Sequence, residues 1–226
     1  MQKLDDIFKR RFDRSEEGRD EVKEAERSAN IKSATREFGW GYAGTLPDGV
    51  PWGAPGFDDF IVHPKGKVLI VALNTELNAA MEWAAGTLPN LVTLAGPPGV
   101  GKTHLAGAAA QVVADGHHQL LYRSEHDLLE DFRPGRNPEE AEYAYREVPW
   151  LIIDDLGVEA LTGWGKAVMD QVVDARWRGA ATGLRTLITT NLLSKDLPPR
   201  LASRLGDRSR ALVVQVAAED YRRRAQ

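Results

Sequence analysis

Residues 96–103 read Gly-Pro-Pro-Gly-Val-Gly-Lys-Thr, the complete Gly-x-x-x-x-Gly-Lys-Thr pattern of a phosphate-binding loop. An apolar run over 91–95 precedes the pattern and a helix-forming run over 104–114 follows it, so strand, loop and helix come in the required order. The glycines let the backbone curl with its N–H groups inward, and the helix adds the positive end of its dipole. A glycine-rich turn with a chance lysine would not explain this context, so we predict a nucleotide site.

The residues of this loop have separate roles toward a nucleotide. Lys102 is expected to reach the β- and γ-phosphates, and the Thr103 hydroxyl to ligate Mg²⁺. The predicted nucleotide-binding residues run from the first glycine into the first helical turn: Gly96, Pro97, Pro98, Gly99, Val100, Gly101, Lys102, Thr103 and His104.

Two carboxylates follow a second apolar run. Residues 150–155 read Trp-Leu-Ile-Ile-Asp-Asp, which is typical of a buried parallel strand with a ligand at its carboxyl end. Adjacent acids there repel each other and lose solvation, and a metal ion offsets both costs. We expect Asp154 to hold Mg²⁺, mostly through water, and Asp155 to polarise the attacking water. The alternative is a strand that merely ends in an acidic turn.

A third polar strand end comes later in the chain. Residues 186–191 read Thr-Leu-Ile-Thr-Thr-Asn, and Asn191 is expected to orient water near the γ-phosphate. The alternative is that Asn191 caps a helix beginning at Ser194 or forms a turn. One arginine beyond that helix would neutralise transition-state charge in a neighbouring subunit, because guanidinium is always charged and binds phosphate in a bidentate way. The candidates are Arg200, Arg204, Arg208 and Arg210, and surface ion pairing is expected for most of them.

The order of apolar runs predicts an α/β fold. Strands are expected over residues 91–95, 120–123, 150–154, 186–190 and 212–216, with helices between them. Such alternation predicts a five-stranded parallel sheet with right-handed crossovers and helices on both faces.

The N-terminal part of the chain differs in composition. Residues 1–37 are rich in charge and helix-compatible, with an apolar face formed by Leu4, Ile7, Phe8 and Phe12. Residues 39–60 hold aromatic residues, glycines and prolines, and 67–85 are predicted to form a helix. We therefore divide the chain into a helical extension with its linker, 1–56, and an ATPase domain, 57–226. The apolar face would dock on a partner or pack on the chain's own domain.

Composition limits the class of protein. The formal net charge is −4, so the chain as a whole should not attract nucleic acid, although basic residues cluster within 9–14 and at 222–224. Cysteine is absent, which excludes disulfides and thiolate metal sites and fits a cytoplasmic protein. No apolar run approaches the roughly 20 residues that span a bilayer, so no membrane partner is expected.

Together these motifs resemble one family. The chain resembles the AAA+ ATPases of the bacterial replicative helicase-loader group, DnaC and DnaI, and the related IstB transposition ATPases. The resemblance covers roughly residues 57–226. It rests on FDDF at 57–60, GPPGVGKTHL at 96–105, LIIDDLG at 151–157, Trp164, DARW at 174–177, TTN at 189–191, SRL at 203–205 and DYR at 220–222. The phosphate loop alone is generic to many NTPases, whereas this ordered set is much more specific.

The resemblance implies roles for matching residues. Asn191 matches the sensor-1 residue, Arg204 the trans-acting arginine finger, and Arg222 the sensor-2 arginine that contacts the γ-phosphate in its own subunit. It also implies ATP and Mg²⁺, self-association in an ATP-dependent oligomer, contact with single-stranded DNA, and a hexameric replicative helicase as partner. Asp155 stands where most AAA+ proteins carry Glu, so we expect slow turnover that DNA or a partner stimulates. Residues 217–226 are too few for the usual helical lid, so a short or absent lid is expected.

The leading interpretation is an ATP-driven loader that delivers a replicative helicase onto single-stranded DNA, with residues 1–37 binding the helicase. One alternative is an IstB-type transposition ATPase, which acts on duplex DNA with a transposase. Another is a nucleotide-gated adaptor with little turnover. A small-molecule kinase shares the phosphate loop, but the two acids, Asn191 and Arg204 together form an AAA+ set.

Overall fold

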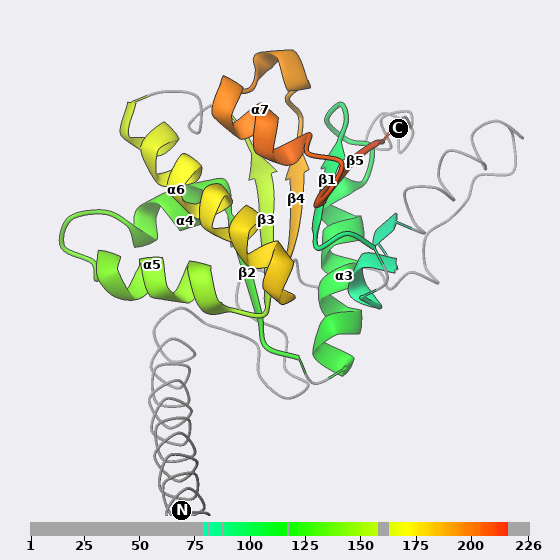
Figure 1. The fold of residues 1–226 in the computed structure, drawn as a ribbon, viewed down its shortest axis with the longest axis horizontal. Helices are drawn as coiled ribbons and strands as arrows, with labels where there is room; N and C mark the ends of the chain where they lie inside the picture. The colour runs from blue at the N-terminus through cyan, green and yellow to red at the C-terminus, as the bar shows by residue number, and fades with distance from the viewer. Residues whose placement is uncertain (1–78, 81, 87, 117, 158–162, 217–226) are drawn as a thin grey trace, which may run out of the picture.

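A computed structural model of the chain describes residues 79–80, 82–86, 88–116, 118–157 and 163–216. In this part, five strands alternate with helices along the chain (Figure 1). The strands are β1 (Leu91–Ala95), β2 (Leu120–Ser124), β3 (Trp150–Leu156), β4 (Arg185–Thr190) and β5 (Ala211–Gln215). The helices are α3 (Lys102–Asp115), α4 (Glu125–Asp131), α5 (Pro138–Glu147), α6 (Gly163–Gly179) and α7 (Pro199–Leu205), with 3-10 turns η3 (Ala180–Thr182) and η4 (Ser194–Asp196).

The strands form one parallel sheet in the order β2-β3-β4-β1-β5. This confirms the predicted five-stranded α/β fold. In this order β4 lies between β1 and β3. The phosphate loop follows β1, the two acids lie in β3, and Asn191 follows β4. The carboxyl ends of parallel strands meet at one edge, so this strand order brings the three motifs together.

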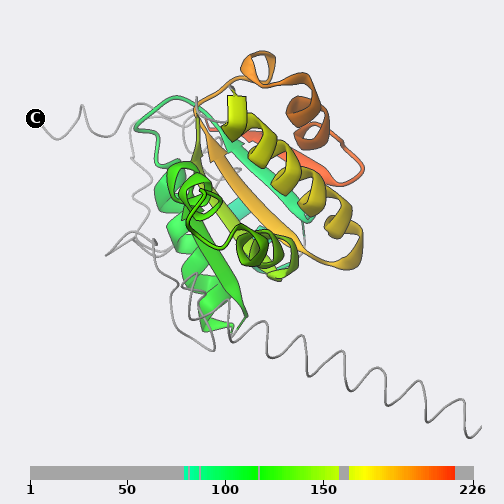
Figure 2. The same cartoon turned by 90° about the vertical axis from the view of Figure 1, so that its left-hand side faces the viewer.

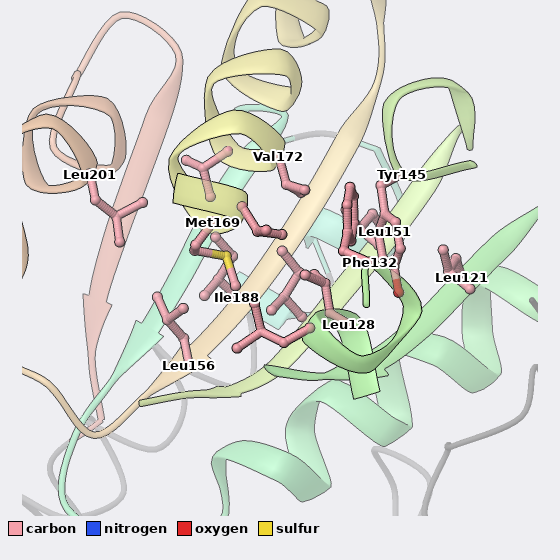
Figure 3. Packing of buried hydrophobic residues seen from close by; sticks show 14 of the residues in the cluster. Leu121, Leu128, Phe132, Tyr145, Leu151, Leu156, Met169, Val172, Ile188 and Leu201 are labelled. Carbon is pink, nitrogen blue, oxygen red and sulfur yellow. The ribbon is translucent and has the colours of Figure 1, made fainter. Parts of the chain in front are cut away.

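Helices cover both faces of the sheet. Successive strand residues alternate between two apolar cores, because side chains along a strand point to opposite faces. Residues of α3 pack in one core, and residues of α4, α5, α6 and α7 pack in the other. Figures 1 and 2 show α3 and α6 on opposite sides of the sheet. Figure 3 shows the second core, where Met169 of α6 lies close to Ile188 of β4 and Leu201 of α7 lies at the edge of the same cluster.

Helical residues also precede the sheet. Residues 79–80 and 82–84 are helical, as predicted for the end of the helix over 67–85, and Trp83 packs edge-on against Trp150 with 5.0 Å between ring centroids. The rest of that predicted helix, the extension over 1–56 and Arg222 lie outside the described residues. In the ranges that are described, no helix is both long and apolar enough to cross a bilayer.

The predicted helix from Ser194 is wrong. The chain forms only the 3-10 turn η4 there, and α7 begins at Pro199. The physical reason is the Pro198-Pro199 pair, because a proline disfavours helical backbone in the residue before it and lacks the N–H that an interior turn needs. Arg200 and Arg204 therefore lie within α7, and Arg208 and Arg210 in the turn after it.

Candidate functional site

The phosphate loop, residues 96–103, connects β1 to α3. Gly101 has a φ of 95° where α3 begins, a conformation that glycine adopts without strain. At the start of the loop, the Gly96 N–H donates to the Thr190 carbonyl at 3.1 Å, and a Cβ on Gly96 would collide with the Val216 carbonyl oxygen. The loop is thus fixed between the end of β4 and the residue that follows β5.

The first turn of α3 offers backbone donors to an anion. Among the described residues, no side chain caps this helix end, and its first turn contains no acidic residue. Unpaired N–H groups and the helix dipole at such an end favour a phosphate. Pro97, Pro98 and His104 are exposed here, while Val100 is buried. The predicted binding stretch is therefore one continuous loop and helical turn, and its contact with nucleotide stays a prediction.

Lys102 lies at the centre of this loop and is only 6% exposed. Its Nζ donates to the carbonyl oxygens of Gly96 at 2.9 Å and Pro97 at 2.8 Å, and to Asn191 Oδ1 at 2.6 Å. The ammonium group therefore sits over the curled backbone and connects the loop directly to the end of β4. A fixed positive charge in this position can offset the charge of bound phosphates.

Three hydroxyl groups surround the buried carboxylate of Asp154. Thr103 Oγ1 and Thr189 Oγ1 donate to Asp154 Oδ1 at 3.2 Å and 2.5 Å, and the Tyr122 hydroxyl donates to Oδ2 at 2.9 Å. Burial, together with the negative charge of Asp154, raises the pKa of Tyr122 far above its usual value. Tyr122 therefore stays protonated and remains a donor to this carboxylate.

Thr103 and Asp154 fit the predicted Mg²⁺ site. Their hydroxyl and carboxylate oxygens lie within hydrogen-bond distance of each other, although they come from α3 and β3. Hard oxygen ligands of this kind suit Mg²⁺, which usually takes one or two protein ligands and completes its shell with phosphate oxygens and water.

Asp155 interrupts the regular geometry of β3. Its φ is 57°, and the pairing of β3 with β4 shifts between Ile153 and Leu156. The strand continues to Leu156, so the prediction that it ends at Asp154 is wrong. The reason is Thr189, whose hydroxyl accepts the Asp155 N–H at 2.8 Å while donating to Asp154. A side chain of β4 thus replaces the ladder hydrogen bond at a β-bulge.

The bulge gives the two carboxylates different surroundings. Asp154 is buried, whereas Asp155 is exposed and its Oδ1 accepts a hydrogen bond from Asn191 Nδ2 at 2.9 Å. A non-glycine residue in the left-handed region costs about 1–3 kcal/mol, and such residues cluster at functional sites. The buried position of Asp154 suits metal binding, and the exposed position of Asp155 suits activation of water. Both roles stay predictions.

Asn191 joins the loop to the second acid. Its side chain accepts from Lys102 Nζ and donates to Asp155 Oδ1, so the three residues form a continuous chain of hydrogen bonds. The alternative role of helix cap is wrong, because Leu193 is the residue that precedes η4 and no side chain caps that turn among the described residues. The structure thus brings together Lys102, Thr103, Asp154, Asp155 and Asn191.

The candidate arginines make their described contacts with residues outside this cluster. Arg200 and Arg204 both pair with Asp174 of α6, at 3.5 Å and 2.9 Å. Arg210 lies 4.3 Å from the centroid of the Trp177 ring. Arg208 is exposed and has no ion pair or ring contact with the described residues. Two of the four arginines, Arg200 and Arg204, therefore form ion pairs. Arg204 is also the residue that the resemblance matches to the arginine finger.

Several residues at the site carry no role in the sequence-based prediction. Tyr122 and Thr189 bond Asp154 directly, and the buried Glu125 accepts the Gly157 N–H at 2.8 Å just beyond the acids. A polar residue within a predicted buried strand is the available signal for Tyr122 and Thr189. For Glu125 the sequence offers no comparable signal.

The chain is similar in sequence to known ATP-binding and replication proteins. A putative ATP-binding protein of insertion sequence IS232 from Bacillus thuringiensis subsp. berliner is 30% identical over 143 residues, covering 59% of this chain and 55% of that protein. A chromosomal replication initiator protein DnaA from Oleidesulfovibrio alaskensis is 26% identical over 163 residues, covering 69% of this chain and 33% of that protein. The chain thus spans about half or less of the length of these relatives.

A solved structure of the DnaC helicase loader is 25% identical with a TM-score of 0.56, and the match covers 74% of this chain and 98% of that one. Residues 77–226, more than half of the chain, match the family of IstB-like ATP binding proteins. This family match covers the phosphate loop, both acids, Asn191 and Arg204. The chain belongs to the IstB-like ATP-binding protein family, and its fold is shared with the DnaC helicase loader.

Proposed function

We propose that the chain is a Mg²⁺-dependent ATPase that loads a hexameric replicative helicase onto single-stranded DNA. The observation that carries the ATPase part is the hydrogen-bonded chain from Lys102 through Asn191 to Asp155. It links a phosphate-binding cation, a neutral amide and an exposed carboxylate at one edge of the sheet. That is the set of groups needed to hold a γ-phosphate and direct water at it.

In this proposal each residue has one task. Lys102 neutralises charge on the β- and γ-phosphates, and Asn191 turns from the lysine to the γ-phosphate and the attacking water. Asp155 accepts a hydrogen bond from that water and polarises it toward attack. Thr103 and Asp154 would hold Mg²⁺, which would neutralise charge on the phosphate oxygens when bound. The Tyr122 and Thr189 hydroxyls keep the Asp154 carboxylate in place.

Arg204 is proposed to act in a neighbouring subunit. α7 packs in the apolar core on the opposite face of the sheet from α3, and Arg204 makes its described contacts with α6. An arginine so placed is well suited to a nucleotide bound across a subunit boundary, where it would stabilise transition-state charge. Self-association in an ATP-dependent oligomer follows from this role.

Mixing two inactive proteins tests the shared site. Lys102→Ala should lose ATP binding or hydrolysis tenfold or more, and Arg204→Ala should bind ATP but hydrolyse it slowly. Mixed together, the two proteins should recover part of the lost activity, because each supplies the half that the other lacks. Normal hydrolysis by Arg204→Ala under assembling conditions would overturn the trans role.

The loader role is supported by the match to the DnaC helicase loader, which covers 98% of that chain. A transposition ATPase is the second candidate, and the family match together with the IS232 relative favours it. ATP hydrolysis with single-stranded and with duplex oligonucleotides of one sequence separates the two. Stimulation by the single strand and ATP-dependent capture of a helicase support the loader. Stimulation by the duplex and capture of a transposase support the second candidate.

A further inference from the structure

Arg204 is held in a defined position by two side chains of α6. Its Nε donates to Asp174 Oδ1 at 2.9 Å, and its guanidinium carbon lies 4.2 Å from the centroid of the Trp177 ring. Three positions separate Asp174 and Trp177, so both fall on one face of the helix. We propose that this pair, the Asp174–Trp177 cradle, positions Arg204 for the nucleotide of a neighbouring subunit; the inference rests on the trans role proposed above.

The cradle leaves the phosphate-binding edge of Arg204 available. Asp174 engages Nε, and no described residue is hydrogen-bonded to Nη1 or Nη2. A guanidinium group binds phosphate through two parallel N–H donors, and the two Nη atoms provide such a pair. The contact with the Trp177 ring restrains the plane in which these donors lie. The contact through Nε therefore leaves the Nη edge for a phosphate.

Asp174 is itself firmly held. Its side chain is 6% exposed, and its other oxygen, Oδ2, forms ion pairs with Arg178 Nη2 at 2.7 Å and Arg200 Nη2 at 3.5 Å. Burial alone would raise the pKa of Asp174, but the Arg204 hydrogen bond and the charges of the three arginines outweigh burial and lower it. Because the two oxygens have separate partners, Oδ1 is committed to Arg204.

Apolar side chains join α6 and α7 in addition to this ion pair. Leu201 and Leu205 of α7 are buried in the same core as Val172 and Val173 of α6. These apolar contacts lie beside the cradle and join the two helices without it. Removing the Asp174 carboxylate should therefore release Arg204 while the helices remain packed.

The test compares ATP hydrolysis by the assembled full-length protein and its variants. Asp174→Ala should lower turnover at saturating ATP at least tenfold while the Kd for ATP stays within about twofold, because the phosphate loop is intact. Added to Arg204→Ala, the same change should cause no further loss, since its effect passes through Arg204. Mixing Asp174→Ala with Lys102→Ala protein should restore activity, because the second protein supplies an intact Arg204.

Two controls and a second variant complete the design. Arg178→Ala removes an exposed partner of the same carboxylate and should keep turnover near wild type. If Asp174→Ala does not fold, Trp177→Leu removes the other member of the cradle and tests the same positioning role. Its control is Arg210→Ala, because Arg210 also contacts the Trp177 ring. Wild-type turnover in the folded cradle variant, weaker ATP binding, or an additive loss with Arg204→Ala would overturn the positioning role. Wild-type turnover by Arg204→Ala alone would instead overturn the shared site itself.

Discussion

Thr189 couples the two carboxylates of β3 through a single hydroxyl. It donates to Asp154 Oδ1 and accepts the Asp155 N–H, so the buried carboxylate and the bulge that exposes its neighbour share one hydroxyl. Replacement of this threonine would therefore disturb both acids at once. This coupling makes a small side chain on the neighbouring strand as important to the proposed chemistry as the acids themselves.

We predict that Thr189→Val lowers the free energy of unfolding by about 1–3 kcal/mol, because Asp154 and the Asp155 N–H lose a buried partner. ATP hydrolysis should fall at least tenfold in the same variant. The matched control is Thr93→Val in β1, since Thr93 Oγ1 is buried and has no hydrogen-bond partner among the described residues. This second change should be neutral or stabilising. Denaturant unfolding of both variants measures the difference, and equal losses would contradict the role of Thr189.

At the scale of secondary-structure elements, Arg176 ties α6 to the amino ends of β3 and β4. The side chain is fully buried, and it donates to the carbonyl oxygens of Val148 and Arg185 at 2.7 Å and to Thr186 Oγ1 at 2.8 Å. Burial lowers the pKa of Arg176 to about 9, and the nearby charge of Glu147 opposes this shift. The guanidinium group is still charged at neutral pH and satisfies backbone groups at the end of the sheet opposite the acids.

Arg176→Met should therefore lower the free energy of unfolding by about 3 kcal/mol or more, because it leaves several buried carbonyl groups without donors. The control is Arg178→Met on the same helix, whose side chain is 67% exposed and should cost no more than about 1 kcal/mol. Both variants lose one positive charge, so net charge cannot explain a difference. Similar losses in thermal or denaturant unfolding would show that Arg176 is not a structural clamp.

Most strands were predictable because their apolar runs are long and buried. The runs at 91–95 and 186–190 match β1 and β4 to within one residue, and the phosphate loop follows from local pattern alone. The bulge at Asp155 was not predictable, because the group that stabilises it comes from Thr189, 34 positions away in sequence. The contact of Arg204 with Asp174 spans 30 positions and depends on how α7 packs on α6. Neither pairing can be predicted from neighbouring residues in the sequence.

At the scale of the whole molecule, the cluster of Lys102, Asn191 and the two acids and the Arg204 side chain make separate sets of contacts. The cluster lies where β1, β3 and β4 end, whereas Arg204 lies in α7 against α6. In the proposed oligomer, each subunit would offer its phosphate loop to one neighbour and Arg204 to another. Under the proposed function, ATP hydrolysis would therefore depend on assembly.

The N-terminal residues 1–37 lie outside the described residues, and their role is a prediction from sequence. We expect their deletion to abolish capture of the helicase while ATP binding is kept, because the apolar face of Leu4, Ile7, Phe8 and Phe12 suits docking in a groove. Pull-down and thermal melting of the truncated protein check this. A lower melting temperature with the partner still bound would mean that the segment packs on its own domain.

The central claim is that the cluster around Asp154, Asp155 and Asn191 hydrolyses ATP. Asp155→Asn tests it most directly, because the change keeps the size of the side chain and removes the charge that is proposed to polarise water. ATP binding by titration and ATP turnover at saturating nucleotide should be measured on the same preparation. We predict that the Kd for ATP stays within about threefold of wild type while turnover falls about a hundredfold or more. Turnover at the wild-type rate in Asp155→Asn would contradict the claim.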